Sequence, residues 1–446
     1  MPVAPRDPAL EALPGLLPPR GTPAIVCETL REMGIEASTA GAFLVHVRYR
    51  PGKSCDLAWR FPLPSGRPGL VSARVFRNDG GARIAREPSF QALAVRAQQA
   101  LALATPPYRC LEDGRLLLQF FPLDSRLPGL VDATSEAWAN AALPGVLDAG
   151  RAAAWRVAAS PKAYRAWRRC VLQYERDGDR PQRYFAKVFH DDRGAAMLSR
   201  LAAVGRQLAG GPWRVVTPAA YLPEQRMLLL PAIEHGVKFA SLIKAGPEEA
   251  VARQHAVSAA HAAAGGLLRF QQVDVDGLPT VSPRDVIDTW RRKSARIALV
   301  EPALAHAIEE RLCSLEAALD ALPPEPIVVA HGAFRHGQLL LGEGGLVALD
   351  LDTLCRSGAN ADAGNFLACL DSLVVRRERH HAVVRDCQDA FAQTWRRAPV
   401  AHEGWLAWHR AAALVKQAVR AYVSLPARWP QITSALLDLA GDATPC

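Results

Sequence analysis

Alternating apolar and polar positions mark two stretches of the chain as strands in similar surroundings. Residues 73–82 and 186–195 share Ala, Val, Phe, Asp, Gly and Ala at a constant offset of 113 residues. Alternation with a period of two is typical of half-buried strands. Because each block adjoins an Ala-rich helical stretch (89–104 and 194–209) and a further hairpin, the sequence predicts two copies of a small antiparallel sheet carrying one helix.

Beyond Pro231 the pattern changes, and apolar residues recur every three or four positions, as in amphipathic helices. A short β-like piece and two short strands joined by a glycine-rich turn interrupt this helical region. The predicted helices are 247–271, 283–297 and 301–322, the strands are 327–332, 339–341 and 346–351, and the remainder, 361–440, is helical. The sequence therefore predicts an α+β protein whose second half is mostly helical.

Length and composition narrow the class of protein. The 446 residues are 50% hydrophobic and 22% charged, which is typical of a folded chain with two to four domains. The proline-rich segment 1–23 lacks any sustained period and is expected to be a loosely held, flexible arm. That segment lacks the layout of a secretory signal, and no long apolar run follows, so we expect a cytoplasmic protein with no membrane partner.

The basic charge does not indicate nucleic acid as a partner. The formal net charge is +9, but the arginines are spread along the whole chain and the densest run, 376–381, contains an acid. A preference for small anions such as nucleotides is all that this charge supports. Only seven of the 53 basic residues are lysines, so a lysine at a meaningful position stands out.

One segment carries candidate chemistry. It reads His-Gly-Ala-Phe-Arg-His-Gly-Gln at 331–338, followed by Leu-Asp-Leu-Asp at 349–352 and Gly-Ala-Asn-Ala-Asp at 358–362. Together with Ala-Lys-Val at 186–188, these residues resemble the aminoglycoside phosphotransferase family, which includes choline-kinase-like enzymes. The resemblance covers most of residues 150–440.

The resemblance implies a bilobal protein-kinase-like fold. The small lobe is then expected at 146–245 and the helical large lobe at 246–446. The first of the two repeated units, at 24–145, is an additional small-lobe-like copy that precedes them. In that copy Arg74 stands at the position of Lys187. Arg74 could contact an anion, but we favour a structural role.

The resemblance also implies roles for individual residues, with ATP and Mg²⁺ as cofactors. Lys187 contacts the α- and β-phosphates, and Asp350 ligates Mg²⁺ through hard carboxylate oxygens. Asp352 is either a second acid near the metal or a solvated loop charge. Taken without the resemblance, Lys187 is an ordinary strand lysine whose stem covers apolar surface.

Two departures from the family pattern bear on activity. Ala333 replaces the Asp that accepts or orients the proton of the substrate hydroxyl, and Gln338 replaces the Asn that binds the second metal ion. The helix after Lys187 also contains no acid that could pair with it. General-base assistance alone is worth about 10²- to 10⁴-fold in rate, so these changes affect transfer more than binding.

Three hypotheses follow. The first is a pseudokinase-like protein that binds nucleotide in a kinase-like cleft, with transfer lost or altered. The second is an active small-molecule kinase in which Asp352 or His336 compensates, because imidazole titrates near neutral pH. The third is an interaction scaffold with a protein partner. The acceptor molecule and the oligomeric state leave no recognisable pattern in the sequence.

Overall fold

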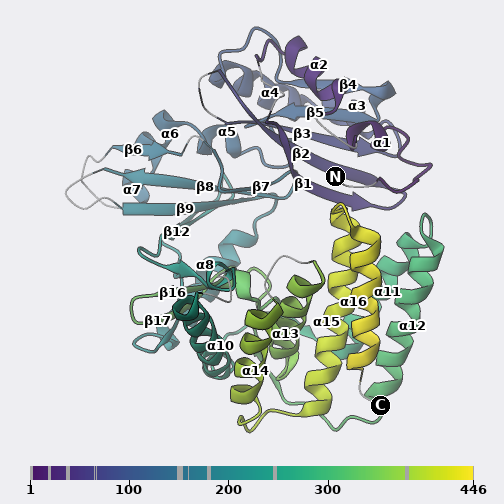
Figure 1. Ribbon diagram of the computed structural model, residues 1–446. Helices are drawn as coiled ribbons and strands as arrows, with labels where there is room; N and C mark the ends of the chain where they lie inside the picture. Colours follow the sequence, from purple (N-terminus) through teal and green to yellow (C-terminus); the bar gives the residue numbers. More distant parts are fainter. Residues whose placement is uncertain are drawn as a thin grey trace. The chain divides into compact units, whose positions relative to one another are not determined.

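The computed structural model describes residues 4–18, 22–36, 41–64, 66, 68–147, 154–158, 160–177, 182–244, 249–376 and 381–444. The chain forms two compact units (Figure 1). The first comprises Met1–Leu198, Pro218–Ala232 and Val423–Trp429, and the second comprises Ser199–Thr217, Ile233–Tyr422 and Pro430–Cys446. Strands dominate the first unit and helices the second, which confirms the predicted α+β class.

The first unit contains two antiparallel sheets. Their strand orders are β1-β2-β3-β5-β4 and β11-β12-β9-β8-β6, and β7 also pairs with β8. The strands of the first sheet are β1 (Phe43–Arg50), β2 (Ser54–Pro62), β3 (Pro68–Phe76), β4 (Tyr108–Leu111) and β5 (Leu116–Phe120). Those of the second are β6 (Trp155–Val157), β7 (Ala163–Arg165), β8 (Arg169–Arg176), β9 (Gln182–Phe189), β11 (Ala220–Leu222) and β12 (Met227–Pro231).

Short helices accompany both sheets. They are α1 (Leu13–Leu16), α2 (Ala24–Glu32), α3 (Gly80–Arg86), α4 (Pro88–Ala100), α5 (Leu130–Ala133), α6 (Glu136–Ala142), α7 (Pro144–Leu147) and the single 3₁₀ turn η1 (Glu112–Gly114). Helix α8 (Arg193–Gln207) follows β9 and continues into the second unit. The helices predicted after each repeated block are therefore present as α4 and α8.

The two sheets share the order of four strands. In the first the order is β2-β3-β5-β4, and in the second it is β8-β9-β12-β11. The paired positions also correspond: Ala73 lies opposite Leu118, as Ala186 lies opposite Leu229. The repeated sequence blocks thus occupy equivalent strands, while their origin by duplication stays a prediction.

Some apolar residues of both sheets belong to one shared buried cluster. Ala58 and Leu70 of the first sheet belong to the same buried cluster as Cys170, Ala186 and Leu229 of the second. The boundary predicted at residue 145 stays a prediction, but this cluster draws residues from both sides of it. The physical reason is size, because a single small sheet with one helix buries too little surface to be stable alone.

The amino-terminal segment is partly packed rather than loosely held. Leu10, Leu13 and Leu16 are buried, and their spacing of three places them on one side of the segment. The Asp7 carboxylate accepts hydrogen bonds from the Tyr49 hydroxyl at 2.7 Å and from the Gly52 amide at 2.9 Å. The prediction of a flexible arm relied on the prolines of this segment and overlooked its leucines.

The second unit combines helices with two small sheets, ordered β10-β17-β16-β13 and β14-β18-β15. Helix α10 packs on α14, and α11 on α12 (Figure 1). The strands are β10 (Trp213–Val215), β13 (Val237–Lys238), β14 (Thr280–Val281), β15 (Ile327–Ala330), β16 (Leu339–Gly342), β17 (Gly345–Ala348) and β18 (Cys355–Gly358). The helices are α9 (Phe239–Leu242), α10 (Ala250–Phe270), α11 (Pro283–Ile297), α12 (Pro302–Leu319), η2 (His336–Gln338), α13 (Ala361–Val375), α14 (His381–Trp395), α15 (Glu403–Ser424) and α16 (Trp429–Ala443).

Among the residues described, no helix is both long and apolar enough to cross a membrane.

Candidate functional site

The carboxylate of Asp362 fixes the segment between β15 and η2 through hydrogen bonds to its backbone. Its oxygens accept hydrogen bonds from the backbone amides of His331 at 2.5 Å and Gly332 at 3.0 Å. Asp362 is 2% exposed and lies in the first turn of α13. A buried carboxylate requires such donors, because an unpaired buried charge is strongly destabilising. The loop is therefore fixed to the start of α13.

The same loop is fixed to the segment after β17. The ring Nε2 of His331 lies 3.0 Å from the carbonyl oxygen of Leu349, which can only accept, so Nε2 carries the proton. The hydroxyl of Thr353 donates to the backbone carbonyl of His331 at 2.9 Å. Gly332 has a φ of +73°, and a Cβ there would lie 2.2 Å from the Thr353 carbonyl oxygen. Only glycine fits this close approach.

The backbones next to Asp350 and at Gln338 are paired at one end of the β16–β17 hairpin. The amide of Leu349 donates to the carbonyl of Gln338 at 2.8 Å, so Gln338 lies across from the residue that precedes Asp350. Asp350 has a φ of +63°, a conformation that is uncommon outside glycine, so β17 ends at Ala348 instead of residue 351 as predicted. The chain therefore leaves the direction of the strand at Asp350, the residue predicted to ligate metal.

The donor set at this end of the hairpin fits Mg²⁺. Asp350 supplies a carboxylate, and the side-chain Oε1 of Gln338 is buried with no hydrogen-bond partner among the described residues. Within the same residues, no group of three or more His, Cys, Asp or Glu side chains could hold a metal ion by itself. Mg²⁺ binds proteins through one or two carboxylates together with phosphates and water, so the Asp350 carboxylate suits it.

The other residues predicted from the sequence lie on the same loops. Ala333 is half-buried, and its methyl group offers no acceptor or ligand. His336 begins the turn η2, and Asp352 lies in the turn after Asp350; both are half-buried. The second unit thus collects Gln338, Asp350, Asp352 and His336 on the two segments that flank the β16–β17 hairpin.

Lys187 lies on a different unit from these residues. It is half-buried near the centre of β9, where it pairs across strands with Val171 and Leu228. At the corresponding position of the first sheet, the Nε of Arg74 donates to the buried carboxylate of Asp56 at 2.5 Å. The guanidinium also lies 4.5 Å from the ring of Trp167. These contacts support the structural role predicted for Arg74.

Sequence reasoning missed a lysine behind the loop. The ammonium of Lys416, on α15, donates to the side-chain oxygen of Asn365 at 2.8 Å. The amide nitrogen of Asn365 in turn donates to the carbonyl of Phe334 at 2.6 Å. A lysine is therefore linked through one side chain to the residue that follows Ala333. The scarcity of lysine in this chain is the signal that could have drawn attention to it.

We expect Lys416 to make stability depend on pH. Burial, and to a lesser extent the charge of Arg420, lower the pKa of Lys416 from 10.5 to about 8. Between these values the unfolded chain binds more protons than the folded one, so stability rises with pH across this window. Relative to Lys416→Met, the unsubstituted protein should gain about 1–3 kcal/mol between pH 7 and pH 10.

Paired thermal melts at the two pH values measure this difference, in which the titration of all other groups cancels. Lys238→Met, at an exposed position on β13, serves as the matched control. An equal stability difference for Lys416→Met at both pH values would contradict the prediction.

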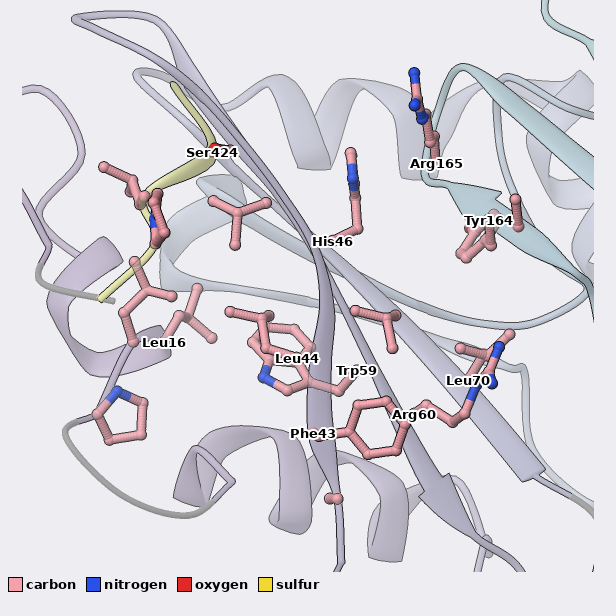
Figure 2. A pocket seen from close by; sticks show the side chains of 18 of the residues that line it. Leu16, Phe43, Leu44, His46, Trp59, Arg60, Leu70, Tyr164, Arg165 and Ser424 are labelled. Atoms are coloured by element: carbon pink, nitrogen blue, oxygen red, sulfur yellow. The ribbon is translucent and has the colours of Figure 1, made fainter. Parts of the chain in front are cut away.

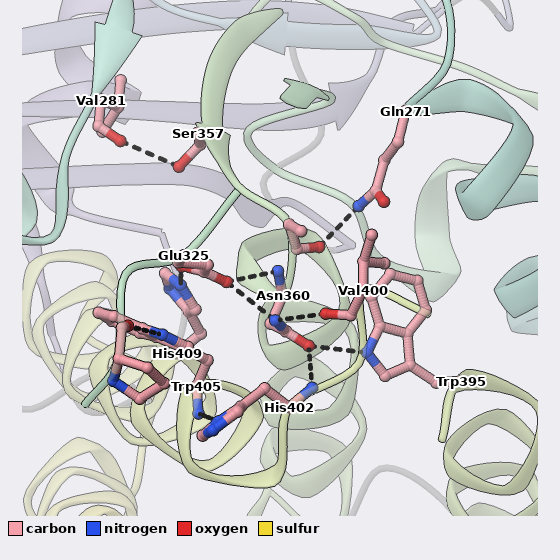
Figure 3. Close-up of polar contacts among 12 residues, drawn as sticks. Gln271, Val281, Glu325, Ser357, Asn360, Trp395, Val400, His402, Trp405 and His409 are labelled. Carbon is pink, nitrogen blue, oxygen red and sulfur yellow. Dashed lines mark hydrogen bonds and ion pairs between the residues drawn. The ribbon is translucent and has the colours of Figure 1, made fainter. Parts of the chain in front are cut away.

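A second buried network fixes the start of α13 (Figure 3). Asn360 is fully buried, and its amide nitrogen donates to Glu325 at 2.9 Å and to the Val400 carbonyl at 3.2 Å. Its side-chain oxygen accepts from the indole of Trp395 at 3.0 Å. The other carboxylate oxygen of Glu325 lies 2.9 Å from Nε2 of His409. Burial alone would raise the pKa of Glu325, but the hydrogen bonds from His409 and Asn360 outweigh it and lower that pKa.

Comparison with known families identifies the class of this protein. The model of the phosphotransferase enzyme family, abbreviated APH, matches residues 171–401, which is more than half of the chain. The chain therefore belongs to this phosphotransferase family. The match begins in β8 and ends just before α15, and it includes Lys187, the 331–338 loop and Asp350. No curated protein matches the chain.

Solved structures give weaker likenesses. A choline/ethanolamine kinase family protein from Mesorhizobium loti is 11% identical, with 68% of this chain and 92% of that chain covered and a TM-score of 0.45. A choline kinase from Cryptosporidium parvum is 10% identical (71% and 93% covered, TM-score 0.47). A macrolide 2'-phosphotransferase from Brachybacterium faecium is 17% identical (60% and 88% covered, TM-score 0.37). All three scores are below 0.5, so the assignment rests on the family model.

Proposed function

We propose that this protein binds ATP through Lys187 and Mg²⁺ through Asp350, and that its phosphoryl transfer is lost or altered. The observation that carries the proposal is the 331–338 loop. Hydrogen bonds fix its backbone, but Ala333 and Gln338 replace the residues that the family pattern has at the reacting positions. Asp362, His331 and Gly332 hold the segment in place, yet Ala333 has no proton acceptor. A metal ion bound here would neutralise phosphate charge, which is the main requirement of phosphoryl transfer.

Gln338 supports retained binding more than retained transfer. Its buried, unbonded Oε1 is costly to desolvate without a partner, and an amide oxygen is a suitable ligand for a hard cation. Asp350 follows Leu349, whose amide donates to the Gln338 carbonyl at the same end of the hairpin. A carboxylate and an amide oxygen can hold a cation, whereas Ala333 cannot accept a proton, so these residues favour binding over transfer.

Thermal melts with and without ATP and Mg²⁺ test the binding half. We expect saturating Mg²⁺-ATP to raise the melting temperature by about 2–6 °C. Asp350→Ala should abolish this shift, because the carboxylate that holds the metal is gone. Glu343→Ala removes an exposed acid from the turn of the same hairpin and should leave the shift unchanged. No shift in the unsubstituted protein would overturn the proposal.

Consumption of ATP, measured with a panel of hydroxyl-bearing small molecules, tests the transfer half. The proposal predicts turnover no faster than that of Asp350→Ala. Rapid turnover with a phosphorylated product, abolished by Asp352→Ala or His336→Ala, would instead establish an active small-molecule kinase with a relocated catalytic group.

A further inference from the structure

The first unit contains a cavity of about 780 Å³ around the edge strand β1 (Figure 2). Every residue that lines it belongs to this unit. The walls come from β1, β2 and β3, from the 162–165 strand, from residues 16–18 and from residues 424–426. Pockets that hold small organic ligands span about 300–1,000 Å³, so the cavity has the size of a ligand site.

Most of the cavity wall is apolar. Leu16, Leu44, Trp59 and Leu70 line it, together with Phe43, which is 54% exposed. Figure 2 shows these side chains gathered along β1 and its neighbours. Exposed apolar side chains in a cavity often mark a binding site. A ligand that covers them removes apolar surface from water, which is favourable. The body of a fitting ligand is therefore apolar.

Apart from the hydroxyls of Tyr164 and Ser424 and the indole of Trp59, the polar side chains of the same wall are basic. They are His46, Arg60, Lys162 and Arg165, and no acid occurs among the described residues that line the cavity. The Nε of Arg60 and the Nε2 of His46 are both buried without a hydrogen-bond partner within the described part of the chain. The Nη2 of Arg60 donates to the Pro161 carbonyl at 3.3 Å. One buried donor, the Nε of Arg60, thus lacks an acceptor, and one ring nitrogen of His46 lacks a partner.

Burial is the main influence on the pKa of His46, and charges of both signs surround it. Burial lowers the pKa of His46 to about 4; the charges of Arg165, Arg48 and Arg168 act in the same direction, and Asp56 opposes them. A neutral imidazole can donate one hydrogen bond, and a ligand with negative charge would be the favoured acceptor. A ligand acceptor would satisfy the Arg60 donor, and leaving such a buried donor unsatisfied is unfavourable.

We propose that this cavity binds a small organic anion with an apolar body, of the class of medium-chain carboxylates. The carboxylate accepts a hydrogen bond from Arg60, and the apolar chain lies against Phe43 and Leu70, which pair with Arg60 and share its face of the sheet. This site is independent of the nucleotide site proposed above, because none of its lining residues belongs to the loops around Asp350.

Isothermal titration calorimetry with decanoate on the full-length protein tests the proposal, with 1-decanol as the neutral probe of equal chain length. We expect decanoate to bind at least about tenfold more tightly than 1-decanol, since one charge-assisted hydrogen bond is worth about 1.5–3 kcal/mol. Saturating Mg²⁺-ATP should leave the affinity for decanoate unchanged. Absence of decanoate binding, equal affinities of the two probes, or displacement by ATP would each overturn the proposal.

Variants locate the bound probe. Arg60→Gln should weaken decanoate binding about tenfold and 1-decanol binding little. Ala163→Trp provides a second variant that keeps the fold, because Ala163 is exposed at the cavity wall and its replacement narrows the space. Ala303→Trp, at an exposed position on α12, is the matched control and should bind like the unsubstituted protein. Unchanged decanoate affinity in Ala163→Trp would contradict the assignment.

Discussion

Asn360→Ala should destabilise the second unit by about 3–5 kcal/mol, which is among the largest effects expected of a single substitution in this chain. The side chain is fully buried and makes hydrogen bonds with Glu325, Val400 and Trp395. Truncation leaves the Val400 carbonyl and the Trp395 indole without these partners and takes one donor from a buried carboxylate. Each unsatisfied buried group costs about 1–3 kcal/mol.

Denaturant unfolding followed by circular dichroism measures this loss. Gln271→Ala is the matched control, because Gln271 makes one hydrogen bond nearby, to the Ala359 carbonyl at 2.6 Å. We expect Gln271→Ala to cost about 1 kcal/mol. If the two variants lose equal stability, the Asn360 network does not have the central role assigned to it.

The Glu325 network could not have been predicted from the sequence. Its members come from residues 325, 360, 395, 400 and 409, and nothing in their spacing brings them together. Their contact depends on how α13, α14 and α15 pack. The sequence did point to Asn360 and Asp362 as part of a family pattern, but it did not reveal which groups they hold.

Much of the secondary structure followed from periodicity. Helix α11 has the predicted bounds, and α10, α12 and the β16–β17 hairpin differ from prediction by only a few residues. The equivalent strand order of the two sheets also follows the repeated blocks. The early end of β17 was missed because the turn at Asp350 depends on tertiary contacts, namely those of Leu349 with Gln338 and His331.

The candidate site was predictable where residue type alone decides the chemistry. Ala333 excludes a proton acceptor at its position, and the backbone of Leu349, next to Asp350, pairs with that of Gln338, while the metal-binding roles of Asp350 and Gln338 stay predictions. Lys416 was missed because its link to the loop runs through Asn365, and a chain of two side-chain contacts leaves no spacing rule in the sequence.

Asp362→Ala should both destabilise the second unit and remove nucleotide binding, although Asp362 is not proposed to touch the nucleotide. Its carboxylate is the acceptor for the amides of His331 and Gly332. Without it, these buried amides lose charge-assisted bonds, and we expect a cost of about 3–5 kcal/mol. Because the Thr353 hydroxyl and the His331 ring connect this loop to the segment around Asp350, the metal-binding position should lose its fixed geometry as well.

The control is Asp386→Ala, which removes a partly exposed carboxylate on α14 that pairs with Arg253. Partly exposed ion pairs contribute about 0–1 kcal/mol, so this variant should melt close to the unsubstituted protein and retain the Mg²⁺-ATP shift. Asp362→Asn keeps the shape of the side chain and removes its charge. It retains one acceptor oxygen, but its NH₂ group replaces the other oxygen and faces a backbone N–H donor. Melts of all three variants with and without Mg²⁺-ATP test whether Asp362 fixes the geometry of the metal-binding position. If Asp362→Ala retains the full rise in melting temperature on addition of Mg²⁺-ATP, the hydrogen bonds of Asp362 do not govern the geometry of Asp350.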